Sequence, residues 1–290
     1  MVTTVEFLGS ELCKISCQSG STKQACAIES AAKWNPNRTI LVTFTSKVGY
    51  SLNSSVSPII AALNAYPNIY FRNVDLTRYS IQTPMEHWFQ NDQLFLSQYL
   101  NSHTSDFLRY ASMFKFGGIY LDLDVVVQRN FNELPSNFAA AESVRFVAVG
   151  AMGFQPNGIG HAIAELCVKE FSSSFNGFKW AHNGPGILTR VLKKICQAQL
   201  TSDMTPEKCL RFNVLPQNTF YAIKSKQWQM FFNPNATQET LRLTRNSVLV
   251  HVWNKYSASQ IIRKRRKKTA YDVIASINCP KVYQASGNSF

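Results

Sequence analysis

Two aspartates, Asp122 and Asp124, are separated by a single residue in an apolar stretch near the middle of the chain. Gly118 to Val127 is rich in β-branched side chains and predicts a buried strand. Residues two apart on a strand share a face, so both carboxylates would lie on one side together with Tyr120. Two neighbouring carboxylates repel each other and are costly to remove from water. The pair therefore indicates either a divalent-cation site or a strand that ends at solvent.

The residues just before this strand predict a helix. Thr104 and Ser105 can cap its start, and Gly117 offers its end. Asp106 and Arg109, three residues apart, can face each other on that helix. Such pairs are common surface salt bridges, so the spacing alone indicates no more than that. The apolar side chains of the helix share one face: Phe107, Tyr110, Ala111 and Phe114.

The other apolar segments alternate between strand and helix patterns. Up to residue 74 the order is strand, helix, strand, helix, strand, which is typical of a parallel sheet covered by helices. We therefore expect an α/β fold with a mostly parallel central sheet and helices on both faces. No linker or repeat interrupts the chain, which favours a single domain. The predicted strands are 5–8, 39–45, 69–74, 145–154 and 247–253, and the predicted helices include 23–33, 57–66, 160–171 and 187–196.

Two segments of the C-terminal half carry residues that could bind a ligand. The turn-forming string AHNGPG, with His182 and Gly184, precedes helix 187–196, whose first N–H groups could meet an anion. In VHVWNK, the last strand places His251 and Trp253 on one side, and Lys255 follows. The ordinary interpretations are a loop–helix junction and a core histidine, so neither segment is decisive alone.

The chain of 290 residues is basic, with a formal net charge of +13, and 45% of its residues are hydrophobic. These values predict a globular protein attracted to an anion: a diphosphate, a membrane surface or a nucleic acid. Residues 263–268, RKRRKK, hold much of the charge, and we expect them on the solvated face of a helix. No apolar run approaches the roughly 20 residues of a membrane span. The apolar stripe of that basic helix would come from Ile261, Ile262, Tyr271, Ile274 and Ile277.

Seven cysteines leave at least one unpaired, and the lack of a CxxC pair argues against a zinc site. We expect Cys196 to pair with Cys209, and Cys26 to pair with Cys13 or Cys17. Spacing alone is compatible both with lumenal disulfides and with a reduced cytosolic protein. Three Asn-x-Ser/Thr sequons matter only if the chain is secreted: Asn37, Asn53 and Asn235.

Four blocks, in their order along the chain, resemble the α-1,4-glycosyltransferases with a DXD sugar-binding region, of the lactosylceramide 4-alpha-galactosyltransferase and alpha-1,4-N-acetylglucosaminyltransferase type. This resemblance implies a single GT-A-type, Rossmann-like catalytic domain over residues 1–290. Its DXD sugar-binding region would span about 40–155, and the region specific to α-1,4 enzymes about 160–285. The blocks are ACAIESAAKWNP (25–36), DFLRYASMFKFGGIYLDLDVVVQ (106–128), AHNGPGILTRVLKKIC (181–196) and VHVWNK (250–255).

The resemblance also implies roles for individual residues. Asp122, Asp124 and His251 would hold Mn²⁺ or Mg²⁺, with Asp124 as a direct ligand and Asp122 acting through ribose or water. Asp106 and Arg109 would hold sugar hydroxyls. Trp253 would lie against the donor and Lys255 would neutralise a phosphate. The expected donor-binding set is Asp106, Arg109, Tyr120, Asp122, His182, Gly184, Trp253 and Lys255.

Two positions depart from the family pattern. Gly9 and Ser10 stand where related chains carry a Glu-Thr-Ser-like turn, and Asn183 replaces a glutamine in a His-Gln-Gly-Pro string. The first departure leaves open a catalytically weak, nucleotide-sugar-binding homologue. The basic run leaves open a nucleic-acid-binding protein, although carboxylates in a groove would repel phosphate unless a metal intervened.

The activity implied by the resemblance is metal-dependent transfer from a UDP-sugar. A hexose or N-acetylhexosamine would move in α-1,4 linkage, with retention of configuration, to a galactose- or N-acetylhexosamine-ended glycolipid or glycan, as in glycosphingolipid biosynthesis. The enzyme would work in the Golgi lumen, near a membrane surface. Because the chain has no anchor helix, we expect it to be soluble as given, as a fragment or soluble relative of a Golgi enzyme.

Overall fold

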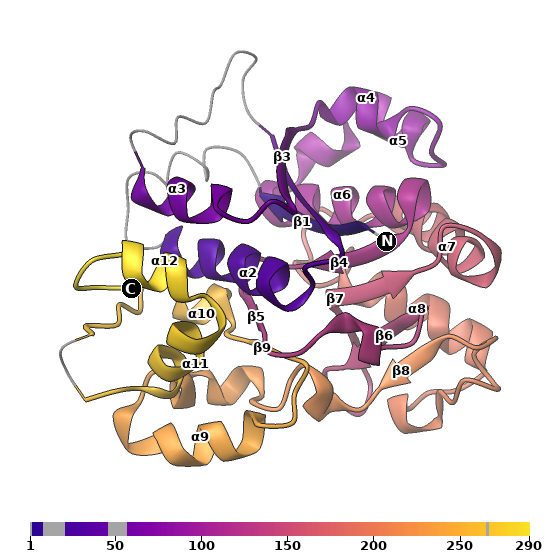
Figure 1. Ribbon diagram of the computed structural model, residues 1–290. Coiled ribbons are helices and arrows are strands. Elements are labelled where there is room, and N and C mark those ends of the chain that lie inside the picture. Colours follow the sequence, from indigo (N-terminus) through magenta and orange to yellow (C-terminus); the bar gives the residue numbers. More distant parts are fainter. Residues whose placement is uncertain (1, 8–20, 46–56, 265–266) are drawn as a thin grey trace.

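The computed structural model describes residues 2–7, 21–45, 57–264 and 267–290. In this part of the chain, seven strands form one sheet in the order β3-β2-β1-β4-β7-β6-β8, and β5 pairs with β9 in a second sheet (Figure 1). The strands are β1 Val2–Phe7, β2 Thr39–Phe44, β3 Ile69–Asn73, β4 Gly118–Leu121, β5 Val125–Val127, β6 Phe138–Ala141, β7 Val147–Phe154, β8 Asn213–Leu215 and β9 Leu249–His251.

Four of the six neighbouring pairs in the large sheet are parallel, which confirms the mostly parallel sheet. Only β7 runs against its neighbours β4 and β6. Because β4 and β6 are both antiparallel to β7, they run in the same direction. The carboxyl ends of β4 and β6 therefore meet at one edge of the sheet, two strand spacings or about 10 Å apart.

Helices cover both faces of the sheet, as predicted (Figure 1). Alternate residues of β4 belong to different cores: Ile119 and Leu121 pack in the core with α2, α3, α11 and α12, whereas Tyr120 packs in the core with α6, α7 and α8. This alternation is the two-residue period of a strand buried on both sides. The helices are α2 Ser21–Trp34, α3 Pro58–Asn64, α4 Leu76–Ser80, α5 Glu86–Gln90, α6 Leu100–Phe116, α7 Gly158–Ser174, α8 Pro185–Cys196, α9 Thr237–Thr244, α10 Asn254–Ser257, α11 Ala270–Asn278 and α12 Pro280–Ala285.

The predicted strand from Gly118 to Val127 is wrong in one respect, because the chain leaves the large sheet at Asp122. The first part, β4, pairs with β1 and β7, whereas β5 pairs with β9. The apolar pattern runs on through the turn because both strands are buried. Tertiary pairing, which no local pattern encodes, decides where the strand divides.

Helix α6 begins earlier than predicted. It starts at Leu100, so Thr104 and Ser105 lie inside it rather than at its N-cap. Its end at Gly117 is confirmed, with φ of +60°. A Cβ at this glycine would lie 2.6 Å from the backbone nitrogen of Pro156, so glycine is required both for the backbone angle and for the close approach.

The predicted basic helix is also wrong for the described residues of 263–268. Ile262 instead exchanges backbone hydrogen bonds with Phe290, at 2.8 and 2.9 Å, and Lys264 donates to the carbonyl of Asn288. Helix α11 begins only at Ala270, after Thr269 caps the N–H of Asp272. The expected stripe does not form a common face, since Ile262, Tyr271 and Ile274 are buried while Ile261 and Ile277 are exposed.

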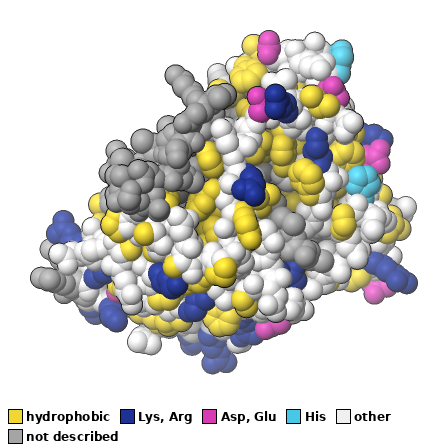
Figure 2. All heavy atoms as spheres, turned by 45° about the horizontal axis from the view of Figure 1, so that its top comes forward, with side chains coloured by type: hydrophobic (Ala, Val, Ile, Leu, Met, Phe, Trp, Pro, Cys, Tyr) yellow, Lys and Arg dark blue, Asp and Glu magenta, His cyan; other side chains and the backbone are white. Residues whose placement is uncertain are grey.

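Basic residues nevertheless outnumber acidic ones, 30 to 17, which gives the net charge of +13. In Figure 2, Lys and Arg gather along the lower edge of the face shown, and Asp and Glu are scattered. Among the described residues, no helix combines the length and the apolar character needed to cross a membrane.

Two disulfides join described cysteines. Cys196 pairs with Cys209, which confirms that prediction. Cys26 pairs with Cys279, so its predicted pairing with Cys13 or Cys17 is wrong. The reason is topological: α2 packs against α11 and α12, which brings together cysteines 253 residues apart. Cys13 and Cys17, like Gly9 and Ser10, lie outside the described residues.

The two disulfides should differ in their contribution to stability. A bond closing a loop of 253 residues restricts the unfolded chain more than one closing 13 residues, by about 5 against about 3 kcal/mol. We therefore expect Cys26→Ser/Cys279→Ser to lower the free energy of unfolding more than Cys196→Ser/Cys209→Ser, measured by denaturant titration. Peptide mapping that joins Cys26 to Cys13 or Cys17 in the native protein would contradict the pairing itself.

Candidate active site

The turn between β4 and β5 carries Asp122 and Asp124 at the carboxyl edge of the large sheet. It is fixed from both sides: the N–H of Asp122 donates to the carbonyl of Gly150 on β7, and the carbonyl of Asp124 accepts the N–H of Val252 after β9, each at 2.8 Å. The turn thus joins the two sheets. Its aspartates sit where strands from both sheets end.

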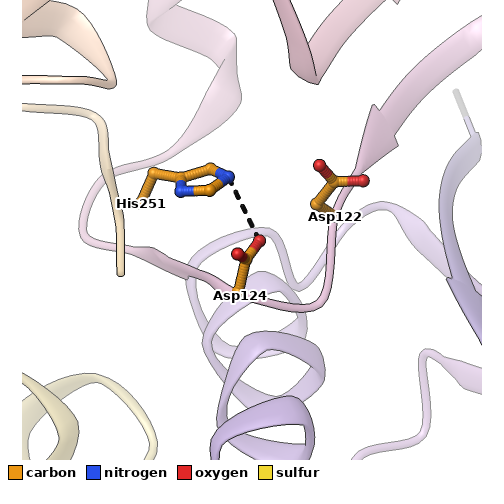
Figure 3. A group of neighbouring side chains, drawn as sticks. All are labelled: Asp122, Asp124 and His251. Carbon is orange, nitrogen blue, oxygen red and sulfur yellow. Dashed lines mark ion pairs between the residues drawn. The ribbon is translucent and has the colours of Figure 1, made fainter. Parts of the chain in front are cut away.

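Asp122, Asp124 and His251 surround a common space (Figure 3). One ligand atom from each lies within 4.8 Å of the other two. Nε2 of His251 is 3.2 Å from Oδ1 of Asp124. The N–H of Trp253 donates to Nδ1 of the same ring at 3.1 Å, which orients Nε2 toward Asp124. His251 lies 127 positions after Asp124 in the sequence, and the structure brings it to the two aspartates as predicted.

These three residues fit a divalent cation. Two carboxylates and one imidazole form an oxygen-rich donor set suited to such an ion. Gly150 leaves the space beside them open, because a Cβ at this position would lie 3.0 Å from Oδ2 of Asp122 and 3.2 Å from Nε2 of His251. The other oxygen of Asp124, Oδ2, accepts the N–H of Asn254 at 2.7 Å, which holds the carboxylate in place.

Asp106 and Arg109 lie next to Asp122 and are more deeply buried than it. Arg109 lies between two carboxylates: Nε is 3.3 Å from Oδ1 of Asp106, and Nη2 is 3.2 Å from Oδ1 of Asp122. Its guanidinium also lies over the ring of Tyr120, whose hydroxyl donates to Asp122 at 2.7 Å. Asp106 and Arg109 are only 5% and 6% exposed, so the predicted salt bridge exists but is not a surface pair.

Burial perturbs the acids of this cluster. It raises the pKa of Asp106 to about 7; Arg109 opposes this shift and Asp122 adds to it. Burial likewise raises the pKa of Asp124, and His251 opposes that shift. Both carboxylates are therefore held where their charge is costly unless a cation compensates it. Perturbed acids gathered in a cleft are typical of functional sites.

The string AHNGPG packs against Asp106 through Gly184. A Cβ at Gly184 would lie 2.4 Å from Oδ1 of Asp106, so this glycine lets Asp106 occupy its position. The ring of His182 bonds to the carbonyl of Ser174 at 2.8 Å, and neither His182 nor Gly184 is among the described residues lining the cleft. Asn183, which replaces the family glutamine, is buried and bonds to His103 at 3.1 Å.

The first turn of α8 does not offer the free N–H groups expected for an anion. The N–H groups of Gly186, Ile187 and Leu188 donate to the carbonyl of Ala181, the carbonyl of Gly184 and the hydroxyl of Tyr110, respectively. The expectation of an anion site at this helix end is wrong because the protein itself supplies the acceptors.

A cleft of about 450 Å³ opens in front of the acidic cluster. Of the predicted residues, Tyr120 lies behind it, fully buried, whereas Trp253 and Lys255 line it. Nζ of Lys255 sits 3.6 Å above the ring of Trp180, so in this structure it contacts an aromatic ring. The indole N–H of Trp253 donates to the carbonyl of Ile223 at 2.9 Å. The other predicted residues lining the cleft are Asp106, Arg109, Asp122, Asp124 and His251.

The cleft lining also includes residues that were not predicted, among them Glu142, Trp180 and Tyr221. Glu142 follows β6, a short alanine-rich strand that carries no motif; burial raises its pKa, and His251 opposes the shift. Tyr221 is buried with its ring 5.6 Å from that of His251, and its hydroxyl has no hydrogen-bond partner in the described structure. A buried unpaired hydroxyl in a cleft wall is a place for a ligand to bond. No sequence signal singles out Glu142 or Tyr221.

A sheet edge that presents two aspartates and a histidine to a cleft, backed by a buried Asp–Arg pair, defines a glycosyltransferase of the DXD class. Comparison with known families agrees. The region described as "Glycosyltransferase sugar-binding region containing DXD motif" matches residues 21–140, and the "Alpha 1,4-glycosyltransferase conserved region" matches residues 156–286.

Individual relatives extend the match over most of the chain. Human lactosylceramide 4-alpha-galactosyltransferase is 33% identical over 264 residues, covering 90% of this chain and 72% of the relative. Human alpha-1,4-N-acetylglucosaminyltransferase is 27% identical over 263 residues, covering 90% and 75%. Among solved structures, the galactosyltransferase LgtC superposes with a TM-score of 0.45 at 12% identity, covering 99% of this chain and 95% of its own.

The chain belongs to the α-1,4-glycosyltransferase family. It is an enzyme, a metal-dependent UDP-sugar glycosyltransferase. The family implies a divalent metal, and the Asp122–Asp124–His251 group is present to hold one.

Replacing Asp124 with Asn should separate metal binding from folding. Asn keeps an oxygen for the N–H of Asn254 but loses the charge that attracts a cation. We expect metal-dependent UDP release to fall by about a hundredfold or more. The melting temperature should stay level or rise, because a buried negative charge has been removed. His251→Ala should have a smaller effect than Asp124→Asn: the variant should need more metal for activity but keep part of it, since the oxygen ligands remain. Undiminished activity of Asp124→Asn without added metal would refute the assignment.

Gly184→Ala and Asp106→Asn should both impair use of the donor substrate. The new methyl group would displace the Asp106 carboxylate, which buried packing and Arg109 otherwise fix. We expect both variants to lower kcat/KM for the donor by about a hundredfold, as a misplaced binding group does. The metal concentration for half-maximal activity should not change. A changed metal requirement with an unchanged KM for the donor would show that Asp106 serves the cation instead.

Proposed function

We propose that the protein transfers a hexose or N-acetylhexosamine from a UDP-sugar, in α-1,4 linkage, to a galactose- or N-acetylhexosamine-ended glycolipid or glycan. The observation that carries this proposal is the Asp122–Asp124–His251 group that lines the cleft, in a chain whose relatives carry α-1,4-transferase names. Higher identity to the galactosyltransferases makes UDP-galactose the first donor to test.

The metal would be Mn²⁺ or Mg²⁺, held by Asp124 and His251 directly and by Asp122 directly or through ribose or water. When bound, it supplies a Lewis acid for the negative charge that develops on the departing UDP. Asp106 and Arg109 would bind hydroxyls of the donor sugar, because they line the cleft next to Asp122. Trp253 would lie against the donor, and Lys255 would exchange its contact with Trp180 for a phosphate oxygen.

We propose that transfer retains the anomeric configuration by attack on one face. The acceptor oxygen bonds to the anomeric carbon as the bond from that carbon to the diphosphate breaks, and the acceptor proton passes to the departing diphosphate oxygen. Glu142 favours a second candidate, double displacement, because it brings a carboxylate into the cleft. In that mechanism the Glu142 carboxylate would first bond to the anomeric carbon as the bond from that carbon to the diphosphate breaks. The acceptor oxygen would then displace Glu142 from the carbon, and the acceptor proton would pass to the diphosphate.

We further propose that residues 1–290 act as one catalytic domain in the Golgi lumen. Two disulfides suit an oxidising compartment. Two of the sequon asparagines, Asn37 and Asn235, are exposed and available for glycosylation. The third, Asn53, lies outside the described residues.

A donor screen tests the activity. We expect UDP release from one of UDP-galactose, UDP-N-acetylgalactosamine or UDP-N-acetylglucosamine, dependent on Mn²⁺ or Mg²⁺ and stimulated by a galactose-ended acceptor. EDTA should abolish it, and Asp124→Asn is the matched inactive control. Tight UDP-sugar binding without release would identify the weak homologue. Salt-dependent retention on DNA with no UDP-sugar binding would instead support the nucleic-acid alternative.

A further inference from the structure

Two loops meet at one side of the cleft mouth. The first comprises the segment before α6 together with the first turn of α6, and the second joins α7 to α8. The N–H of Gln98 donates to the carbonyl of Gly177 at 3.0 Å, and the indole N–H of Trp180 donates to the hydroxyl of Ser102 at 3.0 Å. Backbone packing is also close, since a Cβ at Gly177 would lie 3.2 Å from the Cα of Ser97. The two loops therefore form a continuous surface.

This surface exposes large apolar side chains. Leu96 and Phe178, one on each loop, are 68% and 69% exposed, and four neighbours are also exposed. Soluble proteins seldom gather several such side chains without a partner that covers them. We call the following set the rim patch: Phe95, Leu96, Tyr99, Leu100, Phe178 and Trp180.

Positive charge borders the rim patch on its cleft side. Lys179 is exposed between Phe178 and Trp180, and Nζ of Lys255 lies 3.6 Å above the Trp180 ring. Segments 95–102 and 176–182 contain no Asp or Glu. Tyrosine, tryptophan and lysine next to exposed leucine and phenylalanine are the side chains that settle at a bilayer surface. The rings take the headgroup level, and the amines reach anionic phosphates.

The rim patch is continuous with the cleft. Trp180 belongs to both, and Asn101 and Ser102, which follow Leu100, line the cleft. Whatever covers the rim patch is therefore held at the entrance through which an acceptor reaches the acidic cluster. A glycolipid presents its sugar just above a membrane surface, so docking there would bring that sugar to the cleft mouth.

We propose that the rim patch docks on the surface of an anionic lipid bilayer in which the glycolipid acceptor is embedded. This inference rests on the proposed function only for the nature of the acceptor. A second copy of the chain fits the patch less well, because two positively charged patches without carboxylates would repel each other.

Vesicle flotation tests the docking without any sugar chemistry. The test variant is Leu96→Ser/Phe178→Ser; both side chains are exposed, and neither is among the described residues that line the cleft. The matched control is Leu243→Ser/Ile277→Ser, which removes two exposed apolar side chains from α9 and α11. We expect the native chain to bind phosphatidylcholine vesicles that contain phosphatidylserine. The test variant should bind them about tenfold or more weakly, and the control should bind them normally.

Activity provides the second measurement. With lactosylceramide in the same vesicles as acceptor, the test variant should lose about tenfold in transfer rate. With a water-soluble lactoside and the same donor, it should match the native chain within about twofold. This split isolates docking, because a defect in the catalytic cluster would lower both rates. Flotation stays informative even if no donor is used, so failure of the proposed function and failure of the docking surface are distinguishable.

Four outcomes would overturn the inference. The test variant could float with vesicles as the native chain does. It could lose both transfer activities equally while remaining folded. Vesicle binding could instead disappear only when residues 263–268 are neutralised, which would assign docking to that basic run. Self-association abolished by the test variant, with vesicle binding intact, would identify a second copy as the occupant and likewise refute the proposal.

Discussion

Charge compensation at one edge of the sheet is the constraint on which the rest of the structure depends. Asp106, Asp122 and Asp124 converge there, two of them with pKa values raised by burial. Arg109 balances the inner pair, and His251 faces Asp124. A buried carboxylate without a partner costs several kcal/mol, so this cluster is stable only if each charge has a fixed neighbour. The cation that the family implies would complete this balance.

The fold supplies those neighbours from distant parts of the sequence. Helix α6 holds Asp106 and Arg109 against the end of β4, and β9 brings His251 beside Asp124 by pairing with β5. Gly150 and Gly184 lie where the approach is closest, and a methyl group at either would contact a carboxylate. The division of the central strand into β4 and β5 is thus a requirement of the site, because the turn between them presents both aspartates to the cleft.

The cleft and its rim differ in character for a physical reason. Inside, acids, an arginine and buried aromatics create a polar site partly shielded from water, where electrostatic interactions are strong. Outside, two loops that bond to each other expose apolar and basic side chains. The inner site suits a small charged donor, whereas the rim suits an extended surface. With the proposed docking, the chain would separate the chemistry of transfer, inside the cleft, from the delivery of the acceptor at the rim.

The sequence by itself determined the class of fold, the strand–helix order of the first half, the Cys196–Cys209 pair and the aspartates of the DXD block. Each of these depends on contacts between residues close in the chain, on periodic burial, or on a motif shared with related proteins. Only the tertiary structure decided that Cys26 bonds to Cys279, that Glu142 and Tyr221 enter the cleft, and that His182 stays out of it. These outcomes depend on which faces pack together across more than a hundred residues. A local pattern records that a side chain is buried, but not what it is buried against.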